Sequence, residues 1–325
     1  MSPSINIGSS GFVFDGWERN FYPAGTKHRE HLLYYAVHIP TVEILATRHL
    51  LPRRDVFEKW NAETPSDFIF SFATLKGFSP KYVLAHGTDQ IEVFFRRASI
   101  MGEKFGPIAI TIPEGTPYQK GDALRYFASL PKHRYALDIQ AVPWYNSEVF
   151  AEMARLDMTF VRDRFDDTDA IGSWDYFRAP LGVQKHASSC ACGCGLDASV
   201  ILRKAQVESR DTYLYAKNGK EGLTPNLILR LLKIFGPSNR VNFVDMSGKS
   251  GFPGLKKKDL GPSDPAEGPQ YFGTSQKFVD DSDKVDVMKK DPYPDGDKPL
   301  RMLNYPDKEW DGMSEPFQDK SDKGY

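Results

Sequence analysis

Two periods of apolar residues alternate along residues 5–236 of the chain. Short apolar runs typical of buried strands are separated by stretches in which apolar residues recur every three to four positions, as on one face of a helix. The runs predict strands at Ile5–Gly8, Thr41–Leu45, Phe68–Phe72, Pro107–Ile112, Arg134–Ile139, Thr159–Arg162, Asp175–Arg178 and Thr212–Ala216. The intervening stretches predict helices at His28–His38, Arg53–Asn61, Asp89–Gly102, Lys120–Ser129, Ser147–Leu156, Asp197–Glu208 and Pro225–Phe235.

Strands that alternate with helices are typical of parallel α/β folds. Eight such strands predict a single (β/α)8 (TIM) barrel over residues 1–248, and a doubly wound open sheet is the alternative. The interval between the sixth and seventh strands is too short for a full helix. Asp197 and Ser147 are predicted as N-caps, and Pro225 suits the first turn of the last helix.

The periodic pattern ends near Gly248. Residues 249–325 combine mixed charges with frequent glycine and proline and have no sustained period, which predicts an irregular tail. Aromatic residues nevertheless recur along it, at Tyr271, Phe272, Phe278, Tyr293, Tyr305, Trp310, Phe317 and Tyr325. The tail is therefore either a solvated segment or one that orders on the barrel or on a protein partner.

Composition narrows the functional class. The 325 residues include 42 basic and 43 acidic ones, for a net charge of -1, so there is no overall positive field that would attract nucleic acid. No apolar run approaches the roughly 18–20 residues that a membrane helix needs. The first residues resemble neither a secretory signal nor a transit peptide. We therefore expect a cytoplasmic protein without a membrane partner.

Functional groups of a TIM barrel lie at the C-terminal ends of its strands. Glu43 and Asp138 are predicted there as paired carboxylates for acid–base chemistry or for binding a cation, with Arg178 orienting an anionic group. In the alternative interpretation, Arg162 or Arg178 merely neutralises each carboxylate. The predicted ligand-binding residues are Gly8, Ser10, Gly11, Trp17, Thr111, Trp144 and Asn218.

Three further groups of residues have both a functional and a structural interpretation. The segment Gly8-Ser9-Ser10-Gly11 forms either a backbone nest for an anion or a tight turn after the first strand. Trp144, Trp174 and Tyr176 either stack on a ring of the ligand or pack in the upper barrel. Three histidines share the first helix, on the outside of the barrel, and are read as surface or packing residues: His28, His31 and His38.

All three cysteines lie in one short segment, at Cys190, Cys192 and Cys194, after His186. Soft thiolates at this spacing, with the imidazole as a fourth ligand, predict a zinc or copper site. The usual pairs of C-x-x-C are absent, so the alternative is a loop with free thiols.

Several short motifs follow one another along the barrel part of the chain. They are Gly8-x-Ser10-Gly11-Phe12 with Trp17 and Phe21-Tyr22-Pro23, Tyr34-Tyr35, Thr41-Val42-Glu43-Ile44, Trp60 with Thr64-Pro65, Phe68 and Phe70, Gly106-Pro107, Tyr135-Ala136 with Asp138, Tyr176-x-Arg178, and Tyr213 and Tyr215 with Asn218 and Gly222. In order and spacing they resemble the domain of unknown function 72 (YecE-like) family, whose members are TIM barrels. The resemblance covers most of residues 5–236.

The chain departs from this family pattern mainly at polar positions. Leu45-Ala46 replaces Asn-Ser, Ala73 replaces a lysine, Lys217 replaces the first of two asparagines, and the histidine after Arg178 is missing. The resemblance names no reaction, because the family itself is defined as unknown. It implies an enzyme or enzyme descendant that binds a small polar or phosphorylated ligand at the barrel mouth. Its acid–base site lacks several of the polar residues of the family.

Two other functions remain open from the sequence. The first is a non-catalytic assembly subunit that contacts a protein through residues 249–325. The second is a nucleic-acid-processing barrel, by analogy with metal-dependent endonucleases, although the sequence shows no cluster of His, Asp and Glu for their metals.

Overall fold

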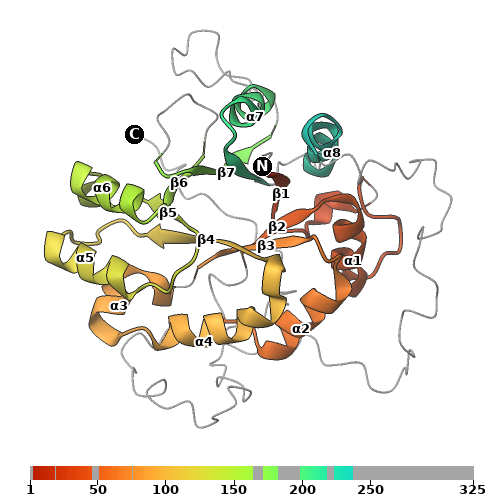
Figure 1. Cartoon of the computed structure of the whole chain (residues 1–325). Helices are drawn as coiled ribbons and strands as arrows, with labels where there is room; N and C mark the ends of the chain where they lie inside the picture. The colour runs from red at the N-terminus through yellow and green to blue at the C-terminus, as the bar shows by residue number, and fades with distance from the viewer. Residues whose placement is uncertain are drawn as a thin grey trace, which may run out of the picture. The chain divides into compact units, whose positions relative to one another are not determined.

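Eight parallel strands close into a barrel in which each strand pairs with the next along the chain and the last pairs with the first (Figure 1). This computed structural model describes residues 3–18, 20–45, 51–74, 76–163, 171–181, 198–217 and 223–236, which all belong to one unit within residues 1–241. The predicted TIM barrel is confirmed. The doubly wound alternative is wrong, because pairing of the first and last strands leaves no open edge.

The strands match the predicted apolar runs. They are β1 (Ile5–Ser10), β2 (Thr41–Ile44), β3 (Ile69–Ala73), β4 (Phe105–Ile112), β5 (Tyr135–Ile139), β6 (Thr159–Arg162), β7 (Trp174–Pro180) and β8 (Asp211–Lys217). β1 runs two residues beyond the predicted end, so Gly8, Ser9 and Ser10 are strand residues and not a turn.

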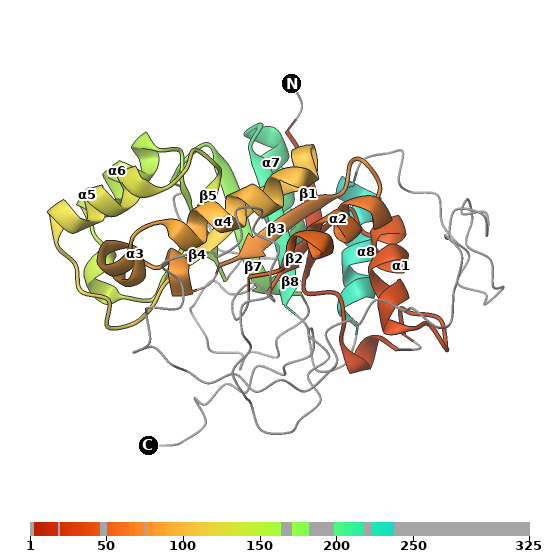
Figure 2. The same cartoon turned by 90° about the horizontal axis from the view of Figure 1, so that it is seen from below.

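The helices surround the barrel (Figure 2). They are α1 (His28–His38), α2 (Arg54–Glu63), α3 (Pro80–His86), α4 (Asp89–Ala98), α5 (Lys120–Ser129), α6 (Ser147–Arg155), α7 (Ala198–Val207) and α8 (Thr224–Phe235), with short 3-10 turns η1 (Asp15–Trp17), η3 (Lys76–Phe78), η4 (Ser99–Lys104) and η5 (Val142–Trp144). Among these described helices, none is both long and apolar enough to cross a lipid bilayer.

Most helix bounds lie within two residues of the sequence prediction, and one whole helix, one N-cap and one helix end differ more. α3 was not predicted, although Ser79 caps it by accepting a hydrogen bond from the Tyr82 N–H and Pro80 occupies its first turn. The N-cap of α6 is Asn146, not Ser147, because the Asn146 side chain accepts from two backbone N–H groups. The helix predicted over Asp89–Gly102 ends at Ala98 and continues as a 3-10 turn.

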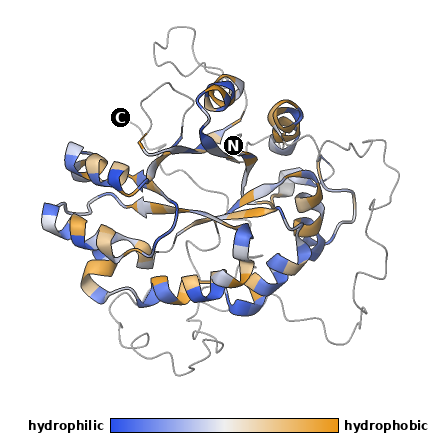
Figure 3. Ribbon diagram, viewed as in Figure 1, coloured by the Kyte–Doolittle hydropathy of each residue, from blue (hydrophilic) through white to orange (hydrophobic). Residues whose placement is uncertain are grey.

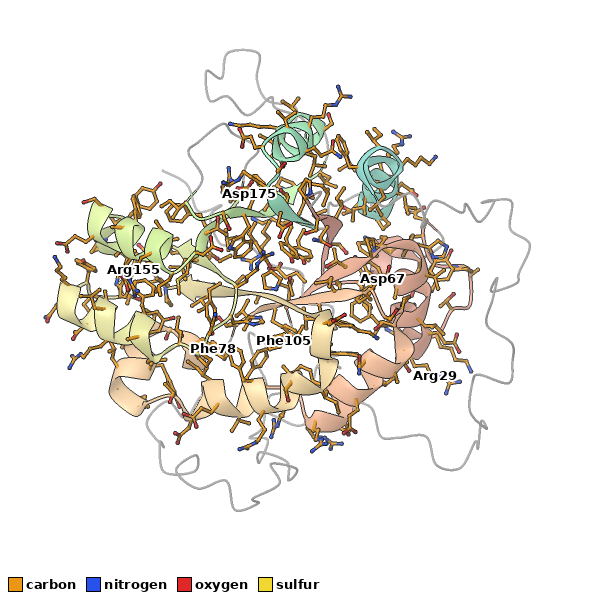
Figure 4. All side chains as sticks on the ribbon, viewed as in Figure 1. Arg29, Asp67, Phe78, Phe105, Arg155 and Asp175 are labelled. Atoms are coloured by element: carbon orange, nitrogen blue, oxygen red, sulfur yellow. The ribbon has the colours of Figure 1, made fainter. Side chains whose placement is uncertain are left out.

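Aromatic side chains fill the layer between sheet and helices. Phe72 of β3 contacts Phe57 of α2 and Phe94 of α4, with ring centres 5.9 and 5.3 Å away. Phe78 and Phe105 lie in this layer, whereas Arg29 and Arg155 point outward (Figure 4). The helices accordingly carry hydrophilic residues along their outer sides (Figure 3).

The interior of the barrel is built in levels. Near the N-terminal ends of the strands, Trp174 and Tyr213 pack edge to face, with ring centres 5.8 Å apart. Arg134 lies 5.6 Å above the Trp174 ring and forms a 2.8 Å ion pair with Asp211, which covers this end. Tyr176 and Tyr215 pack above them together with small alanines. The next level, at the C-terminal ends of the strands, is charged.

Gly106-Pro107 marks an irregularity in the sheet. The register between β3 and β4 shifts between Phe70 and Phe72, and Pro107 lies at this point because it has no N–H to donate to the ladder. A Cβ atom on Gly106 would lie 2.5 Å from a methyl group of Ile69. The Gly-Pro pair therefore fits the chain at this bulge.

We predict that Gly8→Ala destabilises the barrel, because the added Cβ would lie 2.0 Å from the Thr41 carbonyl oxygen on the neighbouring strand. The expected loss is about 1–3 kcal/mol or more of unfolding free energy. Gly121→Ala is the matched control, since Gly121 lies in α5 with open space around it and alanine favours a helix by up to about 1 kcal/mol. Urea unfolding of both variants checks this, and equal effects would contradict it.

We also predict that the barrel loses stability in mild acid. His31 is 2% exposed and stacks on Tyr22 with ring centres 4.0 Å apart; burial, and then the charge of nearby His28, lower the pKa of His31. The unfolded chain therefore binds a proton at His31 more readily than the folded chain does. The stabilisation that neutral His31 gives the folded state is fully present above about pH 6.5 and is lost as the pH falls through the lowered pKa. His31→Phe should flatten the pH dependence of thermal unfolding between pH 7.5 and 5.5, and an unchanged slope would exclude His31 as its source.

Candidate functional site

The buried part of the charged level at the C-terminal mouth is assembled from three strands, β1, β2 and β7. Ser10 of β1 lies beside Glu43 of β2 in the sheet register. Tyr176 and Arg178 of β7 point into the barrel because residues two apart share one face of a strand. Since β8 and β1 separate β7 from β2 in the sheet, these two long side chains reach Glu43 across the barrel interior.

The Glu43 carboxylate is fully buried and receives hydrogen bonds on both oxygens. Ser10 Oγ donates to Oε2 at 2.6 Å, and Tyr176 Oη donates to Oε1 at 2.6 Å. Arg178 adds Nε, at 2.9 and 2.8 Å from the two oxygens, and Nη2, at 2.5 Å from Oε1. Such short bonds to an ionised group are among the stronger hydrogen bonds in proteins.

These contacts determine the charge of Glu43. Burial by itself would raise the pKa of Glu43, but the charge of Arg178 and the hydrogen bonds from Arg178, Ser10 and Tyr176 outweigh it, and the pKa lies below its ordinary value. The same pair raises the pKa of Arg178 against the opposing effect of burial. Burial and the Glu43 charge also raise the pKa of Tyr176, which stays a neutral donor. Glu43 is therefore an ionised acceptor already occupied by protein donors, an arrangement that suits positioning Arg178 better than taking up a substrate proton.

Asp138 is the carboxylate of this level that reaches solvent. Its side chain is 24% exposed. Arg178 Nη1 lies 3.4 Å from Oδ2, and the same oxygen accepts from Thr111 Oγ1 at 3.3 Å and from Gln140 Nε2 at 3.5 Å. Arg178 thus connects a buried acid to a partly exposed one.

A second polar group lies one level below. Tyr215 Oη is 2.9 Å from Thr41 Oγ1 and 2.7 Å from Ser71 Oγ, and the Tyr215 ring packs on Tyr176 at 5.2 Å. Sequence reasoning missed Thr41 and Ser71 as parts of the barrel interior. Their positions in the sequence could have indicated this role. Thr41 lies two residues before Glu43 and Ser71 two residues before Ala73, and residues two apart on a strand share one face.

Comparison with known proteins places this chain. A family model described as "Protein of unknown function DUF72" matches residues 6–247. The chain belongs to this family. A crystal structure of a DUF72 family protein from Thermotoga maritima MSB8 superposes with a TM-score of 0.54 at 19% identity, covering 71% of this chain and 98% of that one. One from Enterococcus faecalis V583 gives 0.50 at 16% identity and covers 72% and 96%. No curated protein matches the sequence significantly.

The resemblance predicted from the sequence is thereby confirmed. Identities this low show the fold alone, so the DUF72 comparisons assign no ligand or reaction to this chain. Of the predicted site residues, the structure brings Ser10, Glu43, Thr111, Asp138 and Arg178 together at the barrel mouth. Four of these, all except Thr111, come from the motifs that carried the resemblance to the DUF72 family.

Gly8 and Gly11 have structural explanations in this DUF72 barrel. Gly8 allows the close approach of β1 to Thr41. Gly11 adopts a φ of +83°, which favours glycine, and its N–H donates to the Glu43 carbonyl at 2.8 Å. The Ser9 N–H donates to Tyr35 Oη at 3.0 Å. Protein acceptors therefore already take two N–H groups of the segment Gly8–Gly11, which does not favour the anion-nest interpretation.

Trp17 and Trp144 lie elsewhere in the fold. Trp17 is fully buried and stacks on Tyr35 of α1. Trp144, also fully buried, donates from Nε1 to the Pro117 carbonyl at 3.0 Å and packs against Tyr126 and Phe127 of α5. The structure thus places both rings in packing between the sheet and its surroundings.

Arg162 does not neutralise the mouth carboxylates, contrary to one interpretation of the sequence. It pairs with Asp175 and lies over the Phe177 ring at 4.4 Å. Asp175, labelled in Figure 4, also accepts from Arg210 at 2.9 Å. Strand alternation puts Asp175 on the opposite face of β7 from Tyr176, so this cluster lies outside the barrel lumen.

The remaining predicted positions lie outside the described residues. These are Asn218, the predicted metal ligands Cys190, Cys192 and Cys194 with His186, the predicted cap Asp197, and the tail 249–325. Within the described part of the chain, no group of three or more His, Cys, Asp or Glu side chains is arranged to hold a metal ion.

We predict that Glu43→Gln costs about 3–5 kcal/mol of unfolding free energy, because it leaves Arg178 buried without its counter-charge. The double variant Glu43→Gln/Arg178→Met removes both charges of the pair, so its loss should be smaller than the sum of the two single losses by about 1 kcal/mol or more. Urea unfolding at neutral pH measures this coupling. Additive losses would show that the two side chains do not stabilise each other.

Proposed function

We propose that this DUF72 barrel is an enzyme or enzyme descendant that binds a small polar ligand at its C-terminal mouth. Asp138 contacts the ligand, Arg178 holds Asp138 in place, and Glu43 holds Arg178. Thr111 supports Asp138 from the neighbouring strand.

The observation that supports this proposal is the buried Glu43–Arg178 pair and its extension to the partly exposed Asp138. Two buried charges are costly to desolvate, and apolar side chains of similar size would often stabilise a fold as well or better. At the N-terminal end the same barrel is filled by aromatic side chains. The buried ion pair lies instead at the C-terminal ends of the strands, where TIM barrels carry their functional groups.

Asp138 is the better candidate for proton exchange in any reaction at this mouth. Glu43 is fully buried and its acceptor positions are occupied, whereas Asp138 is partly exposed. General acid–base catalysis needs a group within hydrogen-bonding reach of the substrate. The family residues missing from this chain, among them the histidine after Arg178, are consistent with reduced catalytic capacity.

The alternatives read from the sequence stay predictions. No described residue favours an assembly role for residues 249–325 or a nucleic-acid substrate. Cytoplasmic localisation and a zinc or copper ion at Cys190, Cys192 and Cys194 are likewise predictions.

A ligand screen by differential scanning fluorimetry tests the proposal. We predict that members of a panel of polyols, sugars, amines and their phosphate esters raise the Tm, since a ligand at 100 times its Kd adds about 2.7 kcal/mol of stability. Asp138→Ala should remove the shift. The control Asp122→Ala alters an exposed carboxylate of α5 and should keep it. A panel without hits, or shifts that persist in Asp138→Ala, would contradict the proposal.

A further inference from the structure

We propose that the ligand of the barrel mouth donates hydrogen bonds to Asp138 through hydroxyl or ammonium groups, and that phosphorylated and carboxylated ligands are excluded. This inference rests on the proposed function and specifies the ligand class of the same site. Two observations support it: the net charge of the mouth, and the protein acceptors that the N–H groups of Arg178 already face.

The three charged side chains of the network sum to a negative charge. Arg178 is neutralised by Glu43, with which it shares three contacts of 2.5–2.9 Å. Asp138 then adds a second carboxylate, 3.4 Å from Arg178 Nη1. An incoming anion therefore meets one arginine and two carboxylates, and in a largely buried setting the repulsion between like charges is weakly screened.

The donors of Arg178 are also directed toward protein acceptors. Nε and Nη2 face Glu43, and Nη1 faces Asp138. The side chain of Arg178 is 7% exposed. A phosphate or carboxylate would have to take Nη1 from Asp138 and remain next to that carboxylate. The bidentate arginine contact that typically binds such anions is already made by Glu43.

Asp138 offers what Arg178 does not, a carboxylate oxygen open to a ligand. Its contacts with Thr111, Gln140 and Arg178 all go to Oδ2 and are 3.3–3.5 Å long. No described residue donates to Oδ1. An ionised carboxylate oxygen accepts hydrogen bonds only, so a ligand that satisfies Oδ1 presents a hydroxyl or an ammonium group.

Among the described residues, Lys217 at the end of β8 adds a positive charge on the mouth side of the barrel. It pairs in register with Pro180, two positions beyond the partner of Arg178. Lys217 is exposed, so water and salt screen its charge. The buried pair and Asp138 therefore dominate the selectivity of the mouth.

Matched triplets of probes test the inference, each consisting of a neutral polyol with its amino and phosphate derivatives: D-glucose, D-glucosamine and D-glucose 6-phosphate are one such triplet. Isothermal titration calorimetry at low salt should find binding of a neutral or amino member to the full chain at least about fivefold tighter than binding of the phosphate ester. The fivefold figure corresponds to the interaction of two unit charges about 4–5 Å apart in water, which is a lower limit for a partly buried site.

Asp138→Asn provides the decisive variant because it removes the charge and keeps the size of the side chain. The variant should bind inorganic phosphate about fivefold or more tightly than the unaltered chain, and should bind the amino member more weakly. Asp122→Asn on α5 removes the same charge far from the mouth and should change neither affinity. Circular dichroism at 25 °C verifies that both variants are folded.

Two results would overturn the inference. If phosphate esters bind most tightly to the unaltered chain and Asp138→Asn weakens them, the ligand class is wrong, and the proposed function stands. If no triplet binds, and Asp138→Asn gains no affinity for phosphate, both the ligand class and the proposed function fail.

Discussion

A buried ion pair between Glu43 and Arg178 connects two strands that are not neighbours in this barrel. The two residues belong to strands separated by two others, and they meet only because the sheet closes through β8 and β1. Fully buried charges are tolerated when each has a counter-charge and hydrogen bonds, which Ser10 and Tyr176 complete. The charged mouth can therefore form only when the barrel is closed. The partly exposed Asp138 acquires its arginine neighbour from the same pair.

The pair divides the lumen into two regions. Toward the N-terminal ends, aromatic rings fill the barrel and Arg134 lies across Trp174. Toward the C-terminal ends, the interior is ionic, and its single partly exposed acid within the network is Asp138. The buried ion pair therefore lies at the end of the barrel where TIM barrels carry their functional groups. The similarity to the Thermotoga and Enterococcus structures, at low sequence identity, shows the fold of this chain but not its ligand.

Much of the fold could be predicted from the sequence because strands buried on both faces read as apolar runs. Thr159–Arg162 and the helix His28–His38 have the predicted bounds. Capping was harder, since Asn146 and Ser147 are both good caps and only the backbone geometry selects Asn146. The end of β1 was missed because glycine and serine favour turns, while pairing with Thr41–Ile44 keeps them extended.

The candidate site was predictable only where it follows from strand ends. Glu43, Asp138 and Arg178 end strands of a barrel and could be named in advance. The role of Tyr176 depends on its reach across the lumen, which strand order alone does not specify. Trp144 follows the same strand as Asp138, but its ring turns outward into α5, and no local pattern distinguishes that from a ring over the mouth.

The ionisation of Glu43 tests this description most directly. With the side-chain carboxyl carbon of Glu43 labelled with ¹³C and assigned by means of Glu43→Gln, its chemical shift can be followed by NMR as pH is lowered in the folded protein. The ordinary pKa of a glutamate side chain is 4.5. A carboxylate held by Arg178, Ser10 and Tyr176 has a lower pKa, so most of it stays ionised at pH 4.5 and it titrates at lower pH. A signal that titrates above pH 4.5 while the barrel remains folded would contradict the buried ion pair and the mouth built on it.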